Sequence, residues 1–584
     1  MEASPAKNKA NQEKEMNNPK NMLLIALFLL GTLLYMKWQE DYGPKPVVPT
    51  PTVQTNSSTV KALDDLNQSQ QQNTNNSADI PTATINSANT EQNLQQSSQQ
   101  NKSNKKSGTL ITVETNVLKL KIDTIGGSIV YAELLKYPVK KHAKENIVLL
   151  NNTTENRYYA QSGLISTTDS FVHTDSYTSQ QTSYSIAQGE IKIPLTIEKN
   201  GLKVVKTYTL KADSYEIELT DNIQNLSNKQ WQGQQYRQLQ RNNPWLNKKV
   251  SFSDPGRMST KGVAYYENAE GYNKIKFADI LDEPVNITAQ DANWIAMIQH
   301  YFFSSIIIEN DKKTNISTKY LKDSTTPYLI RATSDTVQIA AGESKKISTK
   351  LYIGPKLQEN LPKVAKGLEL TVDYGMFTVI AKPLFWVLNK IHSIVGNWGW
   401  SIILLTVLVK LLFFKLTEKQ YNSMARMRKL QPRIKTLKER YKDNKQKFNE
   451  EMMALYKKEK VNPMGGCLPM LVQIPVFIAL YWVLMESVEL RQAPFMLWLQ
   501  DLSSPDPYFI LPAINAFAMF MTQRLSPTPG MDPMQAKIMK FMPLGFSVMF
   551  AFFQSGLVLY WAVNSSLSLI QQYVITKRID AKAH

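Results

Sequence analysis

Three kinds of hydrophobic pattern follow one another along the chain. A single apolar run, MLLIALFLLGTLLYM, occupies Met22–Met36 and is flanked by Lys20 and Lys37. From about Thr109 the pattern changes to alternation, as in LKLKID and YEIELTD, and a period of two predicts β-strands. From about Val372 apolar residues recur at helical spacing or in long runs, which predicts amphipathic and membrane-spanning helices.

The first apolar run has two interpretations, a cleaved signal peptide or a membrane anchor. A signal peptide ends in a small-residue cleavage site, whereas this run continues as KWQEDYGPKP. We therefore expect an uncleaved transmembrane signal anchor over residues 21–38, preceded by a cytoplasmic extension over residues 1–20. Residues 39–108 are rich in Pro, Gln, Asn, Ser and Thr, and we expect a disordered polar tether there.

The alternating region predicts an antiparallel β-sandwich over residues 109–355. Its scattered aromatic residues belong either to the core and rim of the sandwich or to a face that binds carbohydrate. The only cysteine, Cys467, lies outside this region, so no disulfide stabilises it. The five histidines of the chain are too dispersed to form a metal site or a catalytic triad, so no cofactor is expected.

The C-terminal part of the chain predicts helices in and on a membrane. Residues 372–395 are amphipathic but too polar to span, which suits a helix on the bilayer surface that Pro383 kinks or divides. A transmembrane helix follows at 396–415, and four more lie within 466–576, before a tail at 577–584. The four candidate spans are Cys467–Met485, Tyr508–Thr522, Gln535–Phe553 and Gly556–Ile575.

Charge orients these spans. The net charge of +18 indicates an anionic partner, and the stretch from Lys415 to Lys460 holds 15 basic and 6 acidic residues. The next loop is mainly acidic, so the positive-inside rule places the basic loop in the cytoplasm and the acidic loop outside. Both termini are then cytoplasmic, and the sandwich lies in the periplasm of a Gram-negative cell, beside its inner membrane.

The basic loop, residues 416–465, predicts a helical hairpin with a break around Tyr441–Asn444. Each helix has one apolar stripe and a basic back. The loop is either a solvated positive-inside loop in contact with lipid or a docking surface for an anionic partner such as the ribosome. A nucleic-acid enzyme is disfavoured, and no specific nucleic-acid recognition is expected, because the charge adjoins membrane spans and not a catalytic site.

Lys410 interrupts the apolar run SIILLTVLVKLLFFK, which begins at Ser401. A lysine in the middle of a span costs about 2.5–3.5 kcal/mol on insertion scales. Two interpretations remain open from the residues alone. The side chain snorkels towards the headgroups near Lys415, or it lines a polar cavity inside the helical region.

Several longer motifs resemble those of one family. They are VDYGMF at Val372, LTEKQYNSMARMRKLQP at Leu416, NPMGGCLPMLVQIP at Asn462, SVELRQAPF at Ser487 and SGLVLYW at Ser555. With these residues the chain resembles the YidC/Oxa/Alb family of membrane protein insertases, in its Gram-negative form. The resemblance extends from the first anchor to the last span.

The resemblance implies a helical membrane fold with six transmembrane helices: a five-helix insertase core and the N-terminal anchor, with a large periplasmic antiparallel β-sandwich. The core would surround a hydrophilic groove that is open to the cytoplasm and to lipid. Lys410 stands where the family usually has arginine, and lysine keeps the charge but lacks the planar fork of donors. The implied groove residues are Lys410, Thr406, Gln473 and Trp561.

The family's substrates would slide along the third and fifth spans. Methionines suit such a surface because flexible thioethers adapt to varied apolar partners, although they also serve ordinary packing. The candidate slide residues are Met470, Met485, Met542 and Met549. The candidates for ribosome or lipid docking are Arg426, Arg428, Lys429, Arg433, Arg524 and Lys537.

The function implied is that of an insertase and chaperone, without enzymatic chemistry, which inserts and helps to fold inner-membrane proteins. Its partners would be nascent membrane proteins, the Sec translocon, inner-membrane lipids and the ribosome. The main alternative is a polytopic transporter or channel with an accessory periplasmic domain. A membrane-anchored glycan-binding or glycan-modifying enzyme leaves five C-terminal spans unexplained.

Overall fold

The computed structural model describes the sandwich region and most of the C-terminal helices. The predicted anchor over 21–38 and Lys537 lie outside the described residues. The described residues are 79–83, 108–246, 256, 259–308, 313–322, 324–442, 444–459, 461, 468–525, 541–542 and 545–581.

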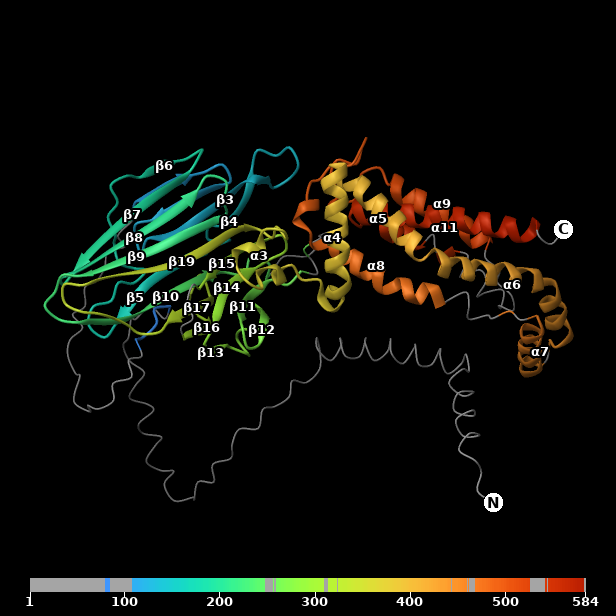
Figure 1. Ribbon diagram of the computed structural model, residues 1–584, viewed down its shortest axis with the longest axis horizontal. Coiled ribbons are helices and arrows are strands. Elements are labelled where there is room, and N and C mark those ends of the chain that lie inside the picture. Colours follow the sequence, from blue (N-terminus) through green and yellow to red (C-terminus); the bar gives the residue numbers. More distant parts are fainter. Residues whose placement is uncertain are drawn as a thin grey trace, which may run out of the picture. The chain divides into compact units, whose positions relative to one another are not determined.

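Nineteen strands are seen among the described residues, and they form two sheets (Figure 1). The larger sheet has the order β13-β16-β17-β10-β5-β3-β2-β1-β6, with β18 beside β10 and β4 beside β3. Its strands are β1 (Leu110–Glu114), β2 (Leu118–Asp123), β3 (Ser128–Pro138), β4 (Asn146–Leu150), β5 (Tyr158–Ser166), β6 (Ser183–Ser185), β10 (Trp231–Arg241), β13 (Asn286–Ala289), β16 (Thr314–Tyr320), β17 (Tyr328–Ser334) and β18 (Val337–Ile339).

The smaller sheet has the order β12-β11-β14-β15-β19-β9-β8-β7. Its strands are β7 (Glu190–Lys199), β8 (Leu202–Lys211), β9 (Glu216–Asn225), β11 (Gly262–Glu267), β12 (Gly271–Lys276), β14 (Ala292–Ile298), β15 (Phe302–Ile307) and β19 (Ser344–Pro355). The strand pairs are antiparallel, except that β1 and β6 run parallel, which the alternation pattern did not predict.

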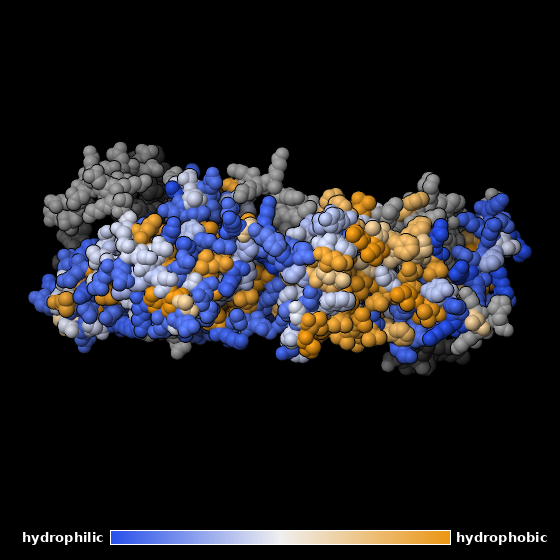
Figure 2. Space-filling view, turned by 90° about the horizontal axis from the view of Figure 1, so that it is seen from above, coloured by the Kyte–Doolittle hydropathy of each residue, from blue (hydrophilic) through white to orange (hydrophobic). Residues whose placement is uncertain are grey.

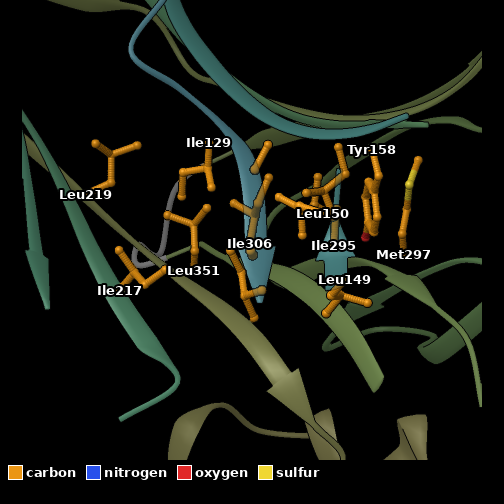
Figure 3. Packing of buried hydrophobic residues seen from close by; sticks show 14 of the residues in the cluster. Ile129, Leu149, Leu150, Tyr158, Ile217, Leu219, Ile295, Met297, Ile306 and Leu351 are labelled. Carbon is orange, nitrogen blue, oxygen red and sulfur yellow. The ribbon is translucent and has the colours of Figure 1, made fainter. Parts of the chain in front are cut away.

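The two sheets share one hydrophobic core. Strand β8 alternates buried and partly exposed residues, so every second side chain faces the other sheet. Figure 3 shows the result: Ile129 and Tyr158 of the larger sheet belong to one cluster with Leu351 and Met297 of the smaller sheet. This shared core makes the strand-rich region a sandwich.

A short piece of the predicted polar tether contacts the outer face of the larger sheet. Asp79 lies 3.1 Å from His173, and its backbone carbonyl accepts a hydrogen bond from Arg331. Residues 79–83 are therefore held against the sandwich, which differs from the expectation of a disordered tether throughout 39–108.

The rest of the described chain is helical. After β19 come α3 (Leu361–Val364) and two short 3-10 turns, η2 (Leu368–Thr371) and η3 (Gly375–Phe377). The remaining helical segments are α4 (Thr378–Val395), α5 (Trp398–Leu412), α6 (Phe414–Arg440), α7 (Lys445–Lys458), α8 (Leu468–Glu486), η5 (Val488–Leu490), α9 (Ile510–Leu525) and α11 (Ser555–Ala581).

Local sequence fixes where α4 ends and α5 begins. Gly396 ends α4 in the left-handed region, with φ of 69°, and Asn397 caps α5 by accepting a hydrogen bond from the Trp400 amide. Helix α4 continues through Pro383, so this proline does not divide the helix into two. The helix also begins at Thr378 and not at residue 372, because the preceding residues form η3.

The predicted second span differs from the observed helices. Helix α5 ends at Leu412, and α6 starts at Phe414, so the first hairpin helix begins within the expected span 396–415. By length and composition no single described helix qualifies as a membrane span, but α5 and α6 qualify as a pair bent by 67°. In Figure 2 apolar surface gathers over the helices, whereas the sheets show mostly hydrophilic surface.

The hairpin helices α6 and α7 pack through their apolar stripes. The break between them falls at 441–444, within the stretch that the sequence indicated. Leu430 and Ile434 of α6 are buried against Tyr456 of α7. The basic side chains are left on the outside, as the amphipathic pattern requires.

Candidate functional site

Lys410 lies on α5 and reaches across to α11. Its ammonium group donates a 2.6 Å hydrogen bond to the Ser568 hydroxyl, which in turn donates to the Asn564 carbonyl at 2.8 Å. No carboxylate pairs with Lys410 among the salt bridges of the described residues. A buried cation is stabilised by a carboxylate or by several oxygen acceptors. Among the described residues Lys410 has one such acceptor, the Ser568 hydroxyl.

Helix α11 supplies a polar strip that extends from this lysine to two other helices. Gln473 of α8 donates to the Asn564 side chain at 3.3 Å. Ser565 donates to Asn515 of α9 at 2.8 Å, and Asn515 is fully buried. Hydrogen bonds between polar side chains therefore connect α11 to α5, α8 and α9 inside the helical region.

Two other predicted groove residues take different positions. Thr406 is 1 % exposed, and its hydroxyl donates to the Ile402 carbonyl of its own helix at 2.6 Å. Trp561 packs against the rings of Phe477 and Phe550. Its indole N–H is buried and has no hydrogen-bond partner in the described part of the chain, so it is a donor without an acceptor.

The predicted slide methionines do not form one set. Met542 and Met549 are exposed, at 45 % and 37 % of their surface. Met485 is buried, and its backbone carbonyl accepts a hydrogen bond from His300 of the sandwich at 2.9 Å. The side chain of Met470 lies outside the described residues, although its backbone belongs to α8.

The basic residues predicted to dock ribosomes or lipid differ in their surroundings. Arg426, Arg428 and Lys429 are exposed on α6. Arg433 forms a 2.6 Å ion pair with Glu459, which connects the second half of α6 to the end of α7. Arg524 lies over the Phe520 ring, 5.1 Å from its centroid, at the end of α9.

Sequence reasoning did not single out the polar residues of α11. The stretch NSSLS from Asn564 places four polar side chains inside an otherwise apolar run. That interruption was the available signal, because a polar side chain within a span usually faces other protein groups. The partner of Lys410 lies 158 positions later, so the pairing itself has no local signature.

A second polar cluster, also missed, lies where the sandwich meets the end of α8. The backbone N–H of Gln358 donates to the Glu489 carboxylate at 3.0 Å, and the hydroxyl of Ser259 donates to the Glu486 carboxylate at 2.5 Å. Burial raises the pKa of Glu489 to about 7 and lowers the pKa of His300 to about 3. His300 is therefore neutral at physiological pH when it binds the Met485 carbonyl.

Comparisons with known proteins cover nearly the whole chain. The family described as "60Kd inner membrane protein" matches residues 390–582, and the family "YidC periplasmic domain" matches residues 110–387. A relative from Methylococcus capsulatus, named "Membrane protein insertase YidC", is 44% identical over 569 residues, covering 97% of this chain and 99% of its own. A relative of the same name from Marinomonas sp. is 42% identical and covers 96% and 98%.

One solved structure also matches over much of the chain. It is described as an active YidC insertase with the first transmembrane domain resolved, and it covers 80% of this chain and 95% of its own. The identity is 18% and the TM-score is 0.37. On the family matches and the full-length relatives, the chain belongs to the YidC family of membrane protein insertases.

Proposed function

We propose that this chain is an inner-membrane protein insertase and chaperone, which inserts and helps to fold membrane proteins without covalent chemistry. The full-length relatives carry the name of insertase. The observation that best supports a mechanism is Lys410, which among the described residues has one hydrogen-bond acceptor, the Ser568 hydroxyl, beside the polar strip of α11. A polar segment of a substrate that enters this region exchanges water for fixed donors and acceptors, which lowers its cost of entering the bilayer.

In this proposal Lys410 is the groove cation, and Gln473 and Trp561 form part of the groove lining. Gln473 donates to Asn564 of the α11 strip, and the buried Trp561 N–H, which has no acceptor among the described residues, would donate to an entering carbonyl. Thr406 contributes to packing, since its hydroxyl bonds within its own helix. The substrate's apolar segment then partitions into lipid, which supplies the driving force.

We assign the substrate slide to exposed residues beside the groove. Met542 and Met549 fit this role because their thioethers are accessible, and Phe517 and Val548 add exposed apolar surface of 62 % and 61 %. Met485 fits it less well, because it is buried beside the sandwich. The role of Met470 stays a prediction from the sequence.

The membrane arrangement that we propose has six transmembrane helices, with both termini in the cytoplasm and the sandwich in the periplasm. The excess of basic residues between Lys415 and Lys460 supports this orientation. Exposed Arg426, Arg428 and Lys429 then form the cytoplasmic surface that meets ribosomes or anionic lipid, with Arg524 and Lys537 as further candidates. Beside the Sec translocon the same groove would receive spans as they leave the channel.

A transporter or channel fits the helices less well. Such a protein needs a polar path across the membrane, with charges on several spans. Within the apolar parts of α5, α8, α9 and α11 the one charged residue is Lys410, whereas Glu486, Arg524 and Lys577 stand at or near helix ends.

The proposed groove role is tested with two matched substrates, one with acidic and one with neutral residues in the translocated segment. Purified protein in liposomes is compared with Lys410→Arg, Lys410→Ala and Lys410→Glu. We expect Arg to be nearly silent, Ala to lower insertion of the acidic substrate about tenfold, and Glu to lower it further, because like charges repel in a low-dielectric site. Equal insertion of the acidic substrate by wild type and Lys410→Ala would contradict the role.

A further inference from the structure

A pocket of about 690 Å³ opens in the sandwich, far in sequence from the groove. Gln235 and Arg237 of β10 line it from the larger sheet, and residues 345–349 of β19 line it from the smaller sheet. Residues 334–337, from the end of β17 to the start of β18, complete its wall. Strands β10, β17 and β19 are labelled in Figure 1.

Incomplete strand pairing opens this pocket. Strand β15 pairs with β19 from Lys350 to Pro355, so residues 344–349 of β19 pair with β9 on one edge and with no described strand on the other. In the larger sheet β10 changes its partner from β17 to β18, and residues 335–336 lie between the two ladders. An edge without a strand partner offers backbone donors and acceptors to an added strand.

Arg237 is the buried charged residue in the lining of this pocket. Its side chain is 4 % exposed, and Nη2 lies 3.4 Å from Oδ2 of Asp221. The same oxygen accepts a 2.8 Å hydrogen bond from Gln235, so Asp221 is shared between two donors. Nε and Nη1 of Arg237 have no partner among the described residues. A buried guanidinium with unmet donors is costly and favours an oxygen ligand.

The rim of the pocket is basic. Lys313, Lys345 and Lys346 line it and are exposed, whereas Asp335 is the one acidic residue in the lining. Asp221 offsets the charge of Arg237, but the lysines leave the mouth of the pocket with an excess of positive charge. Such a mouth attracts anions from solution and orients them towards the interior.

We propose that this pocket binds an extended acidic peptide segment in the periplasm, a function that goes beyond insertion. The peptide pairs with the edge of β19 at residues 345–349, which has no strand partner among the described residues, and its carboxylate side chains meet Arg237 and the rim lysines. Backbone pairing supplies affinity without sequence preference, and the buried guanidinium supplies the preference for acid.

Binding is measured with the full chain in lipid nanodiscs and a fluorescent eight-residue peptide of Ser, Thr and Val that carries two glutamates. A twin peptide carries glutamine at both positions. We expect the glutamate peptide to bind at least tenfold more tightly than its twin, and Arg237→Gln to remove roughly tenfold of that affinity. Equal binding of the twins, or unchanged binding to Arg237→Gln, overturns the proposal.

A rim variant keeps the test valid if Arg237→Gln destabilises the sandwich. Lys345→Gln combined with Lys346→Gln changes two exposed side chains and should weaken binding several-fold and flatten its salt dependence. The control combines Lys211→Gln and Lys229→Gln, two exposed lysines outside the pocket, and should bind as the wild type does. Inorganic phosphate that binds in this pocket while the peptide does not would show a small-anion site and overturn the peptide proposal.

Discussion

Lys206 in the sandwich and Lys410 in the helical region are both lysines turned towards the protein interior, but their partners differ. Lys206 is 1 % exposed and donates to the Gly126 carbonyl at 2.7 Å and the Ser162 hydroxyl at 2.9 Å. It also lies 4.8 Å from the centre of the Tyr177 ring. Lys410 donates to one acceptor among the described residues, the Ser568 hydroxyl.

The difference separates a lysine held by several fixed acceptors from one with a single hydrogen-bond acceptor among the described residues. The ammonium group of Lys206 is surrounded by fixed acceptors, so it connects β8 to β5 and to the turn before β3. Lys410 retains donor capacity, since an ammonium group has three N–H bonds. The same residue type therefore stabilises the fold in one region, and in the other we propose that it offers a binding group.

The largest expected effect is the loss of stability when Lys206 is replaced. Lys206→Met leaves the Gly126 carbonyl and the Ser162 hydroxyl without this donor, and we expect unfolding to become easier by about 2–3 kcal/mol. Lys410→Met should change stability by less than about 1 kcal/mol, because Ser568 still donates to Asn564. Denaturant unfolding followed by tryptophan fluorescence measures both, and equal losses would break the comparison.

The basic residues of the hairpin can also be divided into those proposed to bind a partner and one, Arg433, that forms an ion pair within the protein. Changing Arg426, Arg428 and Lys429 to Gln should lower ribosome co-sedimentation several-fold in low salt and leave helix content unchanged. Arg433→Gln removes the ion pair with Glu459 and should mainly loosen the contact of α6 with α7. Limited proteolysis of the hairpin reports the second effect. Unchanged sedimentation of the triple variant would favour a solvated loop.

The free energy of unfolding at alkaline pH tests whether Lys206 is a buried ammonium group. Burial lowers the pKa of Lys206 from 10.5 to about 8. Between these values the unfolded chain binds more protons at this residue than the folded chain does, so stability rises with pH there. The free energy of unfolding of wild type relative to Lys206→Met should increase from pH 8 to pH 10 and be flat below pH 7. A flat difference throughout would contradict a buried ammonium group.

The smallest expected effect is that of Ser568→Ala. The substitution removes the recorded partner of Lys410, so the cation becomes more available to an acidic substrate. We expect insertion of the acidic substrate to stay within twofold of wild type, in contrast to its loss in Lys410→Ala. The liposome assay measures both variants side by side. A loss as large as that of Lys410→Ala would show that Ser568 positions the lysine.

Much of the fold followed from local sequence. The alternation in VVKTYTLK predicts a strand, and the structure contains β8 there. The Gly396-Asn397 pair marks the boundary between α4 and α5. The alternation alone does not show which set of side chains faces the core, and here Lys206 is on the buried face beside Val204 and Tyr208.

The candidate site was predictable only in part. Lys410 stands out because a lysine is costly inside an apolar run. No local pattern indicated that Ser568 would be its partner, that Thr406 would bond within its own helix, or that Met485 would be buried beside His300.

The sequence by itself determined the order of the regions, the period of each pattern and the placement of charge, because these depend on neighbouring residues. Only the tertiary structure decided which buried polar groups meet. His300 and the Met485 carbonyl are 185 positions apart, and Arg331 and the Asp79 carbonyl are 252 apart. Such pairs depend on how whole sheets and helices pack, since a hydrogen bond requires its two atoms to approach within about 3 Å.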